Sequence, residues 1–496
     1  MPKNREAARA NLENLYRIFT VPEAPHSNLG EIDQAITEDL AGFLQTHIVA
    51  LERSLEEIEG DFASSRIPEE PTFVSEYTEF VKEKLVAQSV HTAAPGFVGH
   101  MTSALPYFML PLSRIMTALN QNLVKVETSK AFTPLERQVL AMLHRLVYHG
   151  DDDFYARWIH DSRHALGAFC SGGTIANVTA LWVARNRLFA PTEGFGGIAR
   201  EGMVRALKRL RDENIRPLAL VGIAGTTETG NIDPLDAMAD VAQALGCHFH
   251  VDAAWGGPTL FSERHRHLLR GIDRADSVTI DAHKQLYVPM GAGMVVFKDP
   301  TALTAIEHHA AYILRHGSKD LGSHTLEGSR PGKALLVHAG MSIIGRKGYE
   351  LLIDLGLEKA RTFADMIRKH PDFELTSAPE LNILTYRYCP AEVQEALVKA
   401  TKAESCRINA LLDQVNQLVQ KIEREAGKTF VSRTRLRVPA YGCKVLTVFR
   451  VVLANPLTTE EILSEVLAEQ CEIVREPEIR ALLDEIKAFC AERLAS

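Results

Sequence analysis

Short apolar runs alternate with amphipathic stretches between residue 160 and about residue 300. The runs "LALVGI", "HFHVD", "SVTID" and "GMVVF" have the length and the apolar content of buried strands. Several of the segments between them have helical spacing instead. This alternation predicts an α/β domain with a largely parallel sheet.

Helices are predicted on both sides of this domain. Residues 27–49 place their apolar side chains on one helical stripe, and "TPLERQVLAMLHRLVY" begins with a capping box formed by Thr133 and Glu136 around Pro134. Residues 333–370 have the pattern of a long helix. Beyond it, strand-like runs such as "LNILTYRY" and "VLTVFRVVL" lie between helices and predict a smaller α+β domain.

We therefore expect three parts in the chain. They are an N-terminal helical segment (1–100), a large α/β domain (101–350) and a small C-terminal α+β domain (351–496). A chain of 496 residues with 46% hydrophobic and 24% charged residues is long enough for such an arrangement.

Charge and cysteine usage exclude several classes of partner and location. The net charge of -8 disfavours nucleic acid or an anionic membrane as a partner, because either would call for a basic face. The start, "MPKNREAARANLENLYRIF", has no long apolar stretch, so we expect neither a secretory signal nor a membrane span. The seven cysteines are scattered and never form a CxxC pair, which predicts a cytoplasmic location and no metal site.

The first chemical motif is "LGAFCSGGTIANVTALWVARNRL", in which an apolar run leads to Ser171, Gly172, Gly173 and Thr174 and then to a helical pattern. Glycines at a turn that opens a helix let backbone N–H groups and the positive end of the helix dipole meet a phosphate. A plain helix N-terminus capped by Ser171 or Thr174 is the alternative. By itself this motif is weak.

The second motif is "LALVGIAGTTETGNIDPLDAMADVAQALGCHFHVDAAWGG", which has the pattern of strand, loop, helix and strand. Its last strand ends in Asp252, and a carboxylate at the end of a buried strand is costly unless a positive group faces it. A salt bridge within the fold would satisfy that requirement. The small residues that follow, however, leave room for a flat ligand: Ala253, Ala254, Gly256 and Gly257.

The third motif, "SVTIDAHKQLYVPMGAGMVVF", holds Lys284 between two strand-like runs, although lysine is among the residues least often buried. A lysine in such a place could form a Schiff base with an aldehyde cofactor. Pyridoxal 5'-phosphate (PLP) requires that lysine, an acidic partner for its ring nitrogen and a cradle for its phosphate. The three motifs together predict a PLP site.

These residues also carry a family resemblance over nearly the whole chain. "HVDAAWGG", "DAHK" and "CSGGTIAN" resemble the group II PLP-dependent amino-acid decarboxylases, which include the glutamate, cysteine sulfinate and aromatic amino-acid enzymes. Within that family, "HTAAPGFVGHMTSALP", "NLVKVETSKAFTPLERQVL" and "LGSHTLEGSRPGKALLVHAG" are most similar to bacterial proteins regarded as PLP-dependent aspartate 1-decarboxylases. The resemblance implies the aspartate aminotransferase-like fold, PLP fold type I, for the large domain.

The resemblance also implies a role for each matching residue. Lys284 would bind the cofactor aldehyde and Asp252 would pair with the pyridine nitrogen. Ala254 would pack under the ring, and Thr227 would lie near the ring or the substrate carboxylate. The phosphate would be surrounded by Ser171, Gly172, Gly173, Thr174 and His283.

Three further residues are expected at the substrate. Arg450, inside "VFRVVLANP", matches an arginine that binds the substrate carboxylate in the glutamate enzymes; a buried ion pair with a protein carboxylate is the alternative. His324 and Tyr312 are candidate donors of a proton to Cα, on or beside a loop that in relatives reaches the site of the neighbouring subunit. The resemblance thus implies a homodimer with shared active sites. An exposed histidine and a packed tyrosine are the alternatives.

Two departures from the family pattern stand out. Many relatives have Asn where this chain has Asp281, and we expect that carboxylate to turn away from the phosphate toward a donor elsewhere. Relatives also carry about two strand-helix units between the phosphate loop and the "GTT" loop, including a histidine that stacks on the ring. The segment before Thr227 is too short for them, so omitted residues with a seam near 206–210 are expected, and no stacking histidine can be assigned.

The expected reaction is PLP-dependent decarboxylation of L-aspartate to β-alanine and CO₂. Near the site, His91, His100, Thr102 and Ser103 could bind a second carboxylate, whereas an aromatic substrate would require an apolar slot. Glutamate and cysteine sulfinate are alternative substrates. Another fold type I PLP reaction, such as transamination or a lyase step, and a non-catalytic paralogue also stay open.

Overall fold

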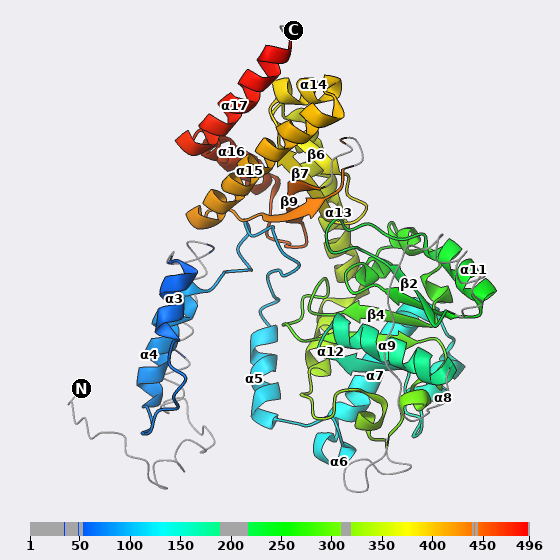
Figure 1. Ribbon diagram of the computed structural model, residues 1–496. Helices are drawn as coiled ribbons and strands as arrows, with labels where there is room; N and C mark the ends of the chain where they lie inside the picture. Colours follow the sequence, from blue (N-terminus) through cyan, green and yellow to red (C-terminus); the bar gives the residue numbers. More distant parts are fainter. Residues whose placement is uncertain are drawn as a thin grey trace.

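The computed structural model describes residues 34, 48, 53–188, 217–308, 319–438, 441 and 445–494, and these residues form two sheets covered by helices. The larger sheet belongs to the part of the chain drawn in cyan and green in Figure 1, and the smaller one lies above it in yellow and orange. Helix α13 (Gly345–Lys369) runs from the first part to the second and packs against both.

The larger sheet has five strands in the order β1-β5-β4-β3-β2. Strands β2, β3 and β4 pair in parallel, but β5 runs antiparallel to both β4 and β1. The expectation of a largely parallel sheet therefore holds only for its β2 to β4 half. Residues 282–292, between β4 and β5, contain no helix and are too short for a parallel crossover. The strands are β1 (Gly167–Cys170), β2 (Ala219–Ile223), β3 (His248–Asp252), β4 (Ser277–Asp281) and β5 (Gly293–Phe297).

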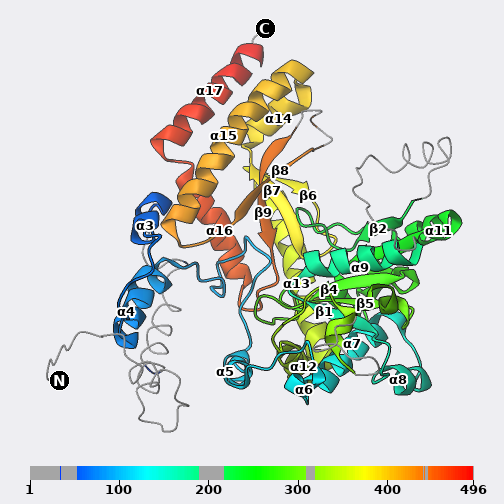
Figure 2. The same ribbon diagram turned by 60° about the horizontal axis from the view of Figure 1, so that its bottom comes forward.

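Each face of this sheet has its own apolar core, because side chains alternate between the faces of a strand. Phe169, Val251 and Val278 point toward α7 (Phe132–Tyr148) and α11 (Leu235–Leu245). The neighbouring Ala168 and Val295 point toward α9 (Gly173–Leu188). Figure 2 shows α9 and α7 on opposite sides of the sheet.

The smaller sheet is antiparallel throughout, with the order β6-β7-β9-β8. Its core joins the strands to α13, α15 and α16, so this part is α+β, as predicted. The elements are β6 (Phe373–Ser377), β7 (Ile383–Tyr388), α14 (Ala391–Lys399), α15 (Lys402–Ala426), β8 (Ser432–Leu436), β9 (Leu446–Val452), α16 (Glu460–Ile473) and α17 (Pro477–Leu494).

The remaining helices lie before and between these parts. Helices α3 and α4 form a pair that stands apart from the body in Figure 1 and buries none of its residues. Within the described ranges, no helix is long and apolar enough to cross a membrane. These helices are α3 (Leu55–Asp61), α4 (Val74–Lys84), α5 (Met109–Leu119), α6 (Val126–Ser129), α8 (Asp152–Trp158) and α12 (Ala334–Ile343).

Two local predictions are wrong. Helix α7 starts at Phe132 without a capping box, because the Glu136 side chain pairs with the buried Arg330 and Thr133 shares a hydrogen bond with Ser129. The expected long helix over 333–370 is two helices, α12 and α13, since Gly345 adopts a φ of +68° that a continuing helix cannot accommodate. The expected helix over 27–49 and the seam near 206–210 lie outside the residues that the structure describes, apart from residues 34 and 48.

Candidate active site

Three of the predicted motifs meet at one edge of the larger sheet. Asp252 is the last residue of β3, Asp281 is the last residue of β4, and Gly173 begins α9 directly after β1. β1, β3 and β4 point the same way, so their carboxyl ends lie together. In open α/β sheets this is the edge at which ligands bind.

Lys284 follows β4 and keeps its amine inside this region. Its side chain is 22% exposed, and its Nζ lies 3.0 Å from Oδ2 of Asp281. Asp281 is only 2% exposed, and its Oδ1 has no hydrogen-bond partner among the described residues. Burial raises the pKa of Asp281, while the charges of Lys284 and His283 oppose that shift. The carboxylate thus turns to the site lysine, and our expectation of a donor elsewhere is wrong.

Asp252 is held by neutral donors. Its Oδ2 accepts a hydrogen bond from Nδ2 of Asn177 at 2.7 Å, and its Oδ1 accepts one from the backbone N–H of Ala254 at 3.1 Å. Among the described residues, no lysine or arginine forms an ion pair with this carboxylate. The sequence predicted a positive group facing Asp252, and no described lysine or arginine fills that role. The position facing Asp252 is therefore left to a ligand.

The turn before α9 forms a close-packed cradle. A Cβ on Gly173 would lie 2.8 Å from the Asp281 carboxylate, and one on Gly293 would lie 2.5 Å from the backbone of Gly172. The His283 ring lies against Gly172. The backbone N–H of Ser171 donates to Oε2 of Glu327 at 2.9 Å, so an anionic oxygen already occupies part of this helix N-terminus. Thr174 is exposed beside them.

Arg450 brings the smaller sheet to this edge. From β9 its Nε donates to the carbonyl of Thr227 at 2.8 Å and its Nη1 to the carbonyl of Gly99 at 3.2 Å, while its Nη2 is buried without a partner in the described structure. The alternative, an ion pair of Arg450 with a protein carboxylate, is not formed among the described residues. Burial lowers the pKa of His100, and the charges of Arg450 and Lys284 lower this pKa further. His100 is therefore close enough to both cations to feel their charge.

Thr102 and Ser103 also end in buried hydroxyls that no described group satisfies. Buried polar groups are usually paired, so these two unpaired hydroxyls, close in the chain to the Gly99 carbonyl that Arg450 binds, are candidates for contact with a polar ligand.

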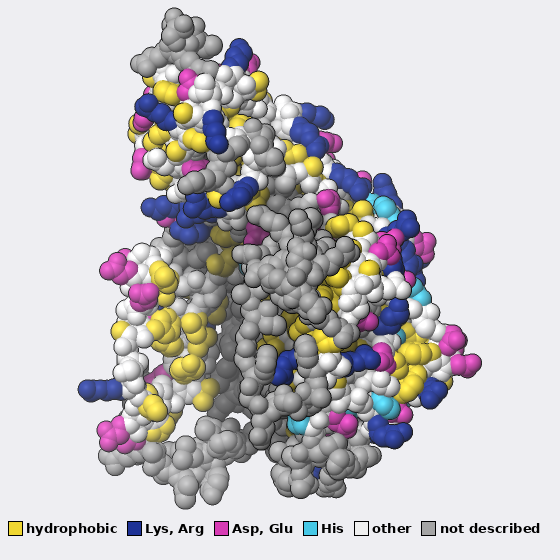
Figure 3. All heavy atoms as spheres, turned by 45° about the vertical axis from the view of Figure 1, so that its right-hand side comes forward, with side chains coloured by type: hydrophobic (Ala, Val, Ile, Leu, Met, Phe, Trp, Pro, Cys, Tyr) yellow, Lys and Arg dark blue, Asp and Glu magenta, His cyan; other side chains and the backbone are white. Residues whose placement is uncertain are grey.

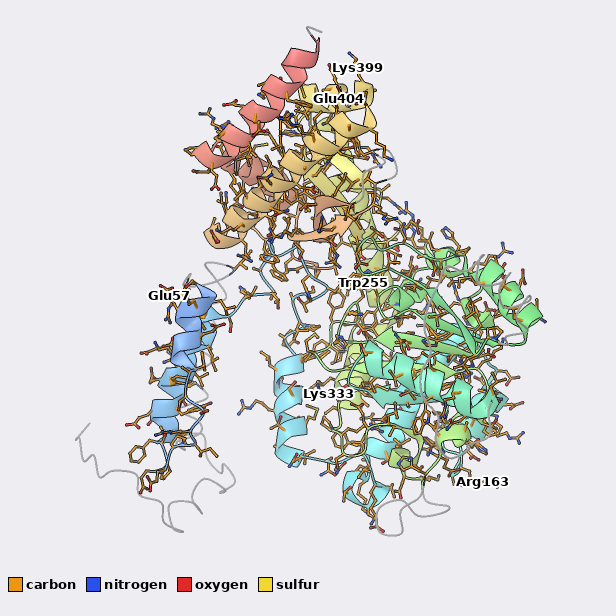
Figure 4. All side chains as sticks on the ribbon, viewed as in Figure 1. Glu57, Arg163, Trp255, Lys333, Lys399 and Glu404 are labelled. Atoms are coloured by element: carbon orange, nitrogen blue, oxygen red, sulfur yellow. The ribbon has the colours of Figure 1, made fainter. Side chains whose placement is uncertain are left out.

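Of the two candidate proton donors, the structure describes only His324, and its ring bonds to groups other than Lys284. His324 is buried, and its ring bonds through Nδ1 to Ser323 and through Nε2 to the carbonyl of Arg163. Trp255 lies three residues after Asp252 in the chain. In Figure 4, Arg163 and Trp255 lie at opposite ends of the large part. Tyr312 lies outside the described residues.

Sequence reasoning missed Asn177 and His250, which connect to Asp252. The signal was present. Polar side chains at positions 248, 250 and 252 share one face of β3, and Asn177 lies one turn into the helix that covers that face.

The residues present fit the PLP that the three motifs predict. One edge of the larger sheet holds the amine of Lys284 and the carboxylate of Asp252, which has no lysine or arginine partner among the described residues. The same edge holds the turn before α9, where the N–H of Ser171 already binds a carboxylate oxygen. No cluster of His, Cys, Asp or Glu within the described ranges could hold a metal ion.

Comparison with known proteins agrees with this chemistry. Residues 196–389 match the family model described as "Pyridoxal-dependent decarboxylase conserved domain". The chain is 56% identical to an aspartate 1-decarboxylase of Aliivibrio fischeri, over 97% of each chain. It is 28% identical to mouse cysteine sulfinic acid decarboxylase, over 78% of this chain and 83% of the relative. The alignment with the Aliivibrio protein runs over 533 positions, more than the 496 residues here, so it contains gaps opposite this chain.

The fold has solved counterparts. The glutamate decarboxylase domain of a Vibrio parahaemolyticus transaminase and decarboxylase protein superposes with a TM-score of 0.74, 20% identity, and coverage of 94% of this chain and 100% of that one. The large part therefore has PLP fold type I, as the resemblance implied. Together with the sequence relatives, this shows that the chain belongs to the family of pyridoxal-dependent amino-acid decarboxylases.

Proposed function

We propose that this protein decarboxylates L-aspartate to β-alanine and CO₂. The observation that carries the proposal is the meeting of Lys284, Asp252 and the glycine cradle with a buried, unpaired donor of Arg450 at one sheet edge. The 56% identity to an aspartate 1-decarboxylase supports aspartate, and the cysteine sulfinic acid relative keeps other acidic amino acids as the second candidate.

When bound, PLP supplies an electron sink for the pair of electrons that the departing carboxylate leaves on Cα. Lys284 would hold the cofactor aldehyde, and its ion pair with Asp281 keeps the amine at the site beforehand. Asp252 would accept the ring N–H. The phosphate would lie on the N–H groups of Ser171, Gly172, Gly173 and Thr174, beside His283, and Ala254 under the ring.

The substrate would bind between the two sheets. The free Nη2 of Arg450 offers one anion contact, with Thr227 beside it. His100, Thr102 and Ser103 offer the second contact that a dicarboxylic amino acid requires. Tyr312 remains the proposed donor of the proton to Cα, acting across a subunit boundary, whereas His324 is buried and both its ring nitrogens are bonded within its own chain.

We further propose that the protein works as a homodimer in the cytoplasm, with residues 1–100, 101–350 and 351–496 as its three parts. No disulfide joins Cys170, Cys247, Cys389 or Cys471 within the described structure, which supports a reducing compartment. Helices α3 and α4 expose large apolar side chains that a second copy could cover: Leu55, Phe62, Phe73, Val74 and Tyr77. Figure 3 shows hydrophobic side chains on the surface of the lobe at the left.

The experiment is a decarboxylation assay with aspartate, glutamate, cysteine sulfinate and aromatic amino acids, following CO₂ and β-alanine. We expect the highest kcat/KM for aspartate, and His100→Ala should reduce the value for aspartate most. One methylene in a pocket is worth about 1–3 kcal/mol, so some turnover of glutamate is expected. A clear preference for glutamate or cysteine sulfinate would overturn the substrate. An oxo acid product would indicate transamination, and no turnover would indicate a non-catalytic paralogue.

A further inference from the structure

A chain of hydrogen bonds leads to Asp252 on the α9 side of the sheet. His248 Nε2 lies 2.7 Å from Ser277 Oγ, which lies 2.8 Å from His250 Nδ1. His250 Nε2 lies 3.0 Å from Asn177 Oδ1, and Asn177 Nδ2 lies 2.7 Å from Asp252 Oδ2. The three β3 side chains share one face of the strand, Ser277 begins the neighbouring β4, and Asn177 comes from α9.

The carboxylate at the end fixes the direction of every bond in the chain. An ionised Asp252 only accepts, so the Asn177 amide must present its NH₂ group to it and its oxygen to His250. His250 must then carry its proton on Nε2 and accept from the Ser277 hydroxyl at Nδ1. Ser277 in turn accepts from Nε2–H of His248. All four bonds therefore donate toward Asp252.

Two interior members of this chain are sealed from solvent, whereas Asn177 is partly exposed. Ser277 and His250 are buried, and burial lowers the pKa of His250 to about 4, with the neighbouring His248 adding to the effect. His250 is thus a neutral imidazole with one fixed tautomer at neutral pH. The other oxygen of Asp252 is held by the Ala254 N–H, so both carboxylate oxygens have a set orientation.

We propose that Asn177 and His250 are positioning residues that orient Asp252 and stabilise its ionised form against the ring nitrogen of the cofactor. The proposal rests on the proposed pairing of Asp252 with that nitrogen. A hydrogen bond to the charged form of a carboxylate favours that form, and polarised chains of such bonds strengthen each other. The competing explanation is that these bonds only satisfy buried polar groups of the core.

The test compares Asn177→Leu, His250→Leu and His250→Gln, all loaded with PLP labelled with ¹⁵N at the ring nitrogen. The ¹⁵N chemical shift reports the protonation of that nitrogen independently of turnover. Glutamine can place an N–H near the position of His250 Nε2. The protonated fraction of the ring nitrogen and kcat should therefore be closer to the wild type in His250→Gln than in His250→Leu. Asn416→Leu removes a buried amide that bonds to Tyr388 in the smaller sheet, and it serves as the matched control.

Both leucine variants should lower the protonated fraction of the ring nitrogen and reduce kcat by about 10- to 100-fold, the size expected for one hydrogen bond to a charged group. The KM for the amino acid should change little, and Asn416→Leu should leave the ¹⁵N shift unchanged. The proposal would be overturned if both leucine variants kept the wild-type ¹⁵N shift and the wild-type kcat. A lower melting temperature as the only change would support a purely structural role.

Two further measurements separate the possible failures. If Asp252→Asn leaves the ring nitrogen and kcat unchanged, the proposed function of Asp252 fails, and this proposal fails with it. If Asp252→Asn lowers the protonation of the ring nitrogen and kcat while Asn177→Leu leaves the two unchanged, only the proposed positioning roles fail. Should the leucine variants not fold, ¹⁵N histidine spectra of the wild-type protein test the proposal instead. A His250 proton on Nδ1 would contradict hydrogen bonds that donate toward Asp252.

Discussion

At the residue scale, the candidate site includes buried polar atoms for which the described structure supplies no partner. The Nη2 of Arg450, the hydroxyls of Thr102 and Ser103, and Oδ1 of Asp281 are all buried and unpaired within the described structure. Each such group costs free energy unless something binds it. The unpaired oxygen of Asp281 lies beside Lys284, where a bound ligand would supply its missing partner.

A buried carboxyl group far from this site predicts a pH-dependent stability. Burial raises the pKa of Glu423 to about 8, against 4.5 for the free side chain. Its Oε2 accepts from Gln470, and its Oε1 lies 2.9 Å from the Thr429 hydroxyl, which also lies 2.6 Å from Glu469. One hydroxyl cannot donate to both acids, so a protonated Glu423 donating to Thr429 satisfies the cluster.

The folded state therefore binds a proton that the unfolded state releases between these two pKa values. The free energy of unfolding should fall as the pH rises through that window, by up to about 1.4 kcal/mol per pH unit. Urea unfolding at several pH values should show this slope in the wild type and lose it in Glu423→Gln, which resembles the protonated acid. The exposed Glu395→Gln should keep the slope. An equal slope in Glu423→Gln would contradict the assignment.

At the scale of elements, the cradle depends on how closely β5 approaches the turn before α9. Gly293→Ala would place a methyl group 2.5 Å from the Gly172 backbone and 2.7 Å from Asp281 Oδ1. We expect it to destabilise the protein by about 1–3 kcal/mol and to weaken PLP binding at least tenfold in a fluorescence titration. Gly328→Ala, which would meet nothing within 4 Å, is the control. Unchanged PLP affinity in Gly293→Ala would show that this contact is not part of the cradle.

The elements that the sequence predicted best are those with a strong local signal. The apolar runs of β2 to β5 and the glycine that ends α11 lie where expected, because burial and the left-handed Gly246 specify them locally. The capping box failed because a tertiary partner, Arg330, takes the Glu136 side chain. The antiparallel β5 depends on pairing between distant segments, which periodicity does not report.

The site was predictable in its reactive groups and less so in their surroundings. Lys284, Asp252 and the glycine turn stand out because their residue types are unusual for their positions. The bonds from Asn177 and His250 to Asp252 depend on how α9 packs on β3, and the sequence alone did not connect them. The pairing of Asp281 with Lys284 was likewise visible only in three dimensions.

At the scale of the whole molecule, one sheet edge and one helical pair are uncovered by the residues that the structure describes. In the described structure β2 pairs only with β3, and its Val221 and Ile223 are 41% and 37% exposed. An edge with apolar side chains is a feature that proteins usually protect. The alignment with the Aliivibrio relative contains gaps opposite this chain, and we propose that strand-helix units omitted before β2 account for them.

The exposed pair α3 and α4 is where we expect the contact of the proposed dimer. Replacing Val74 and Tyr77 together by glutamate should shift the protein from dimer toward monomer in analytical ultracentrifugation, because charges are costly in an apolar contact. Val398→Glu changes a side chain on α14 that is 86% exposed and should leave the dimer intact. A wild-type sedimentation profile for the double variant would place the dimer contact elsewhere.

The central claim is that Lys284 holds the cofactor at the edge formed by β1, β3 and β4. The most direct measurement is reduction of the PLP-loaded protein with borohydride, followed by peptide mass mapping of the phosphopyridoxyl label. We predict the label on Lys284 alone and no label and no turnover in Lys284→Ala. Lys333, whose Nζ bonds to the Met290 carbonyl beside the cradle, is the informative competitor. A label on Lys333, or multiple turnover by Lys284→Ala without added amine, would contradict the account.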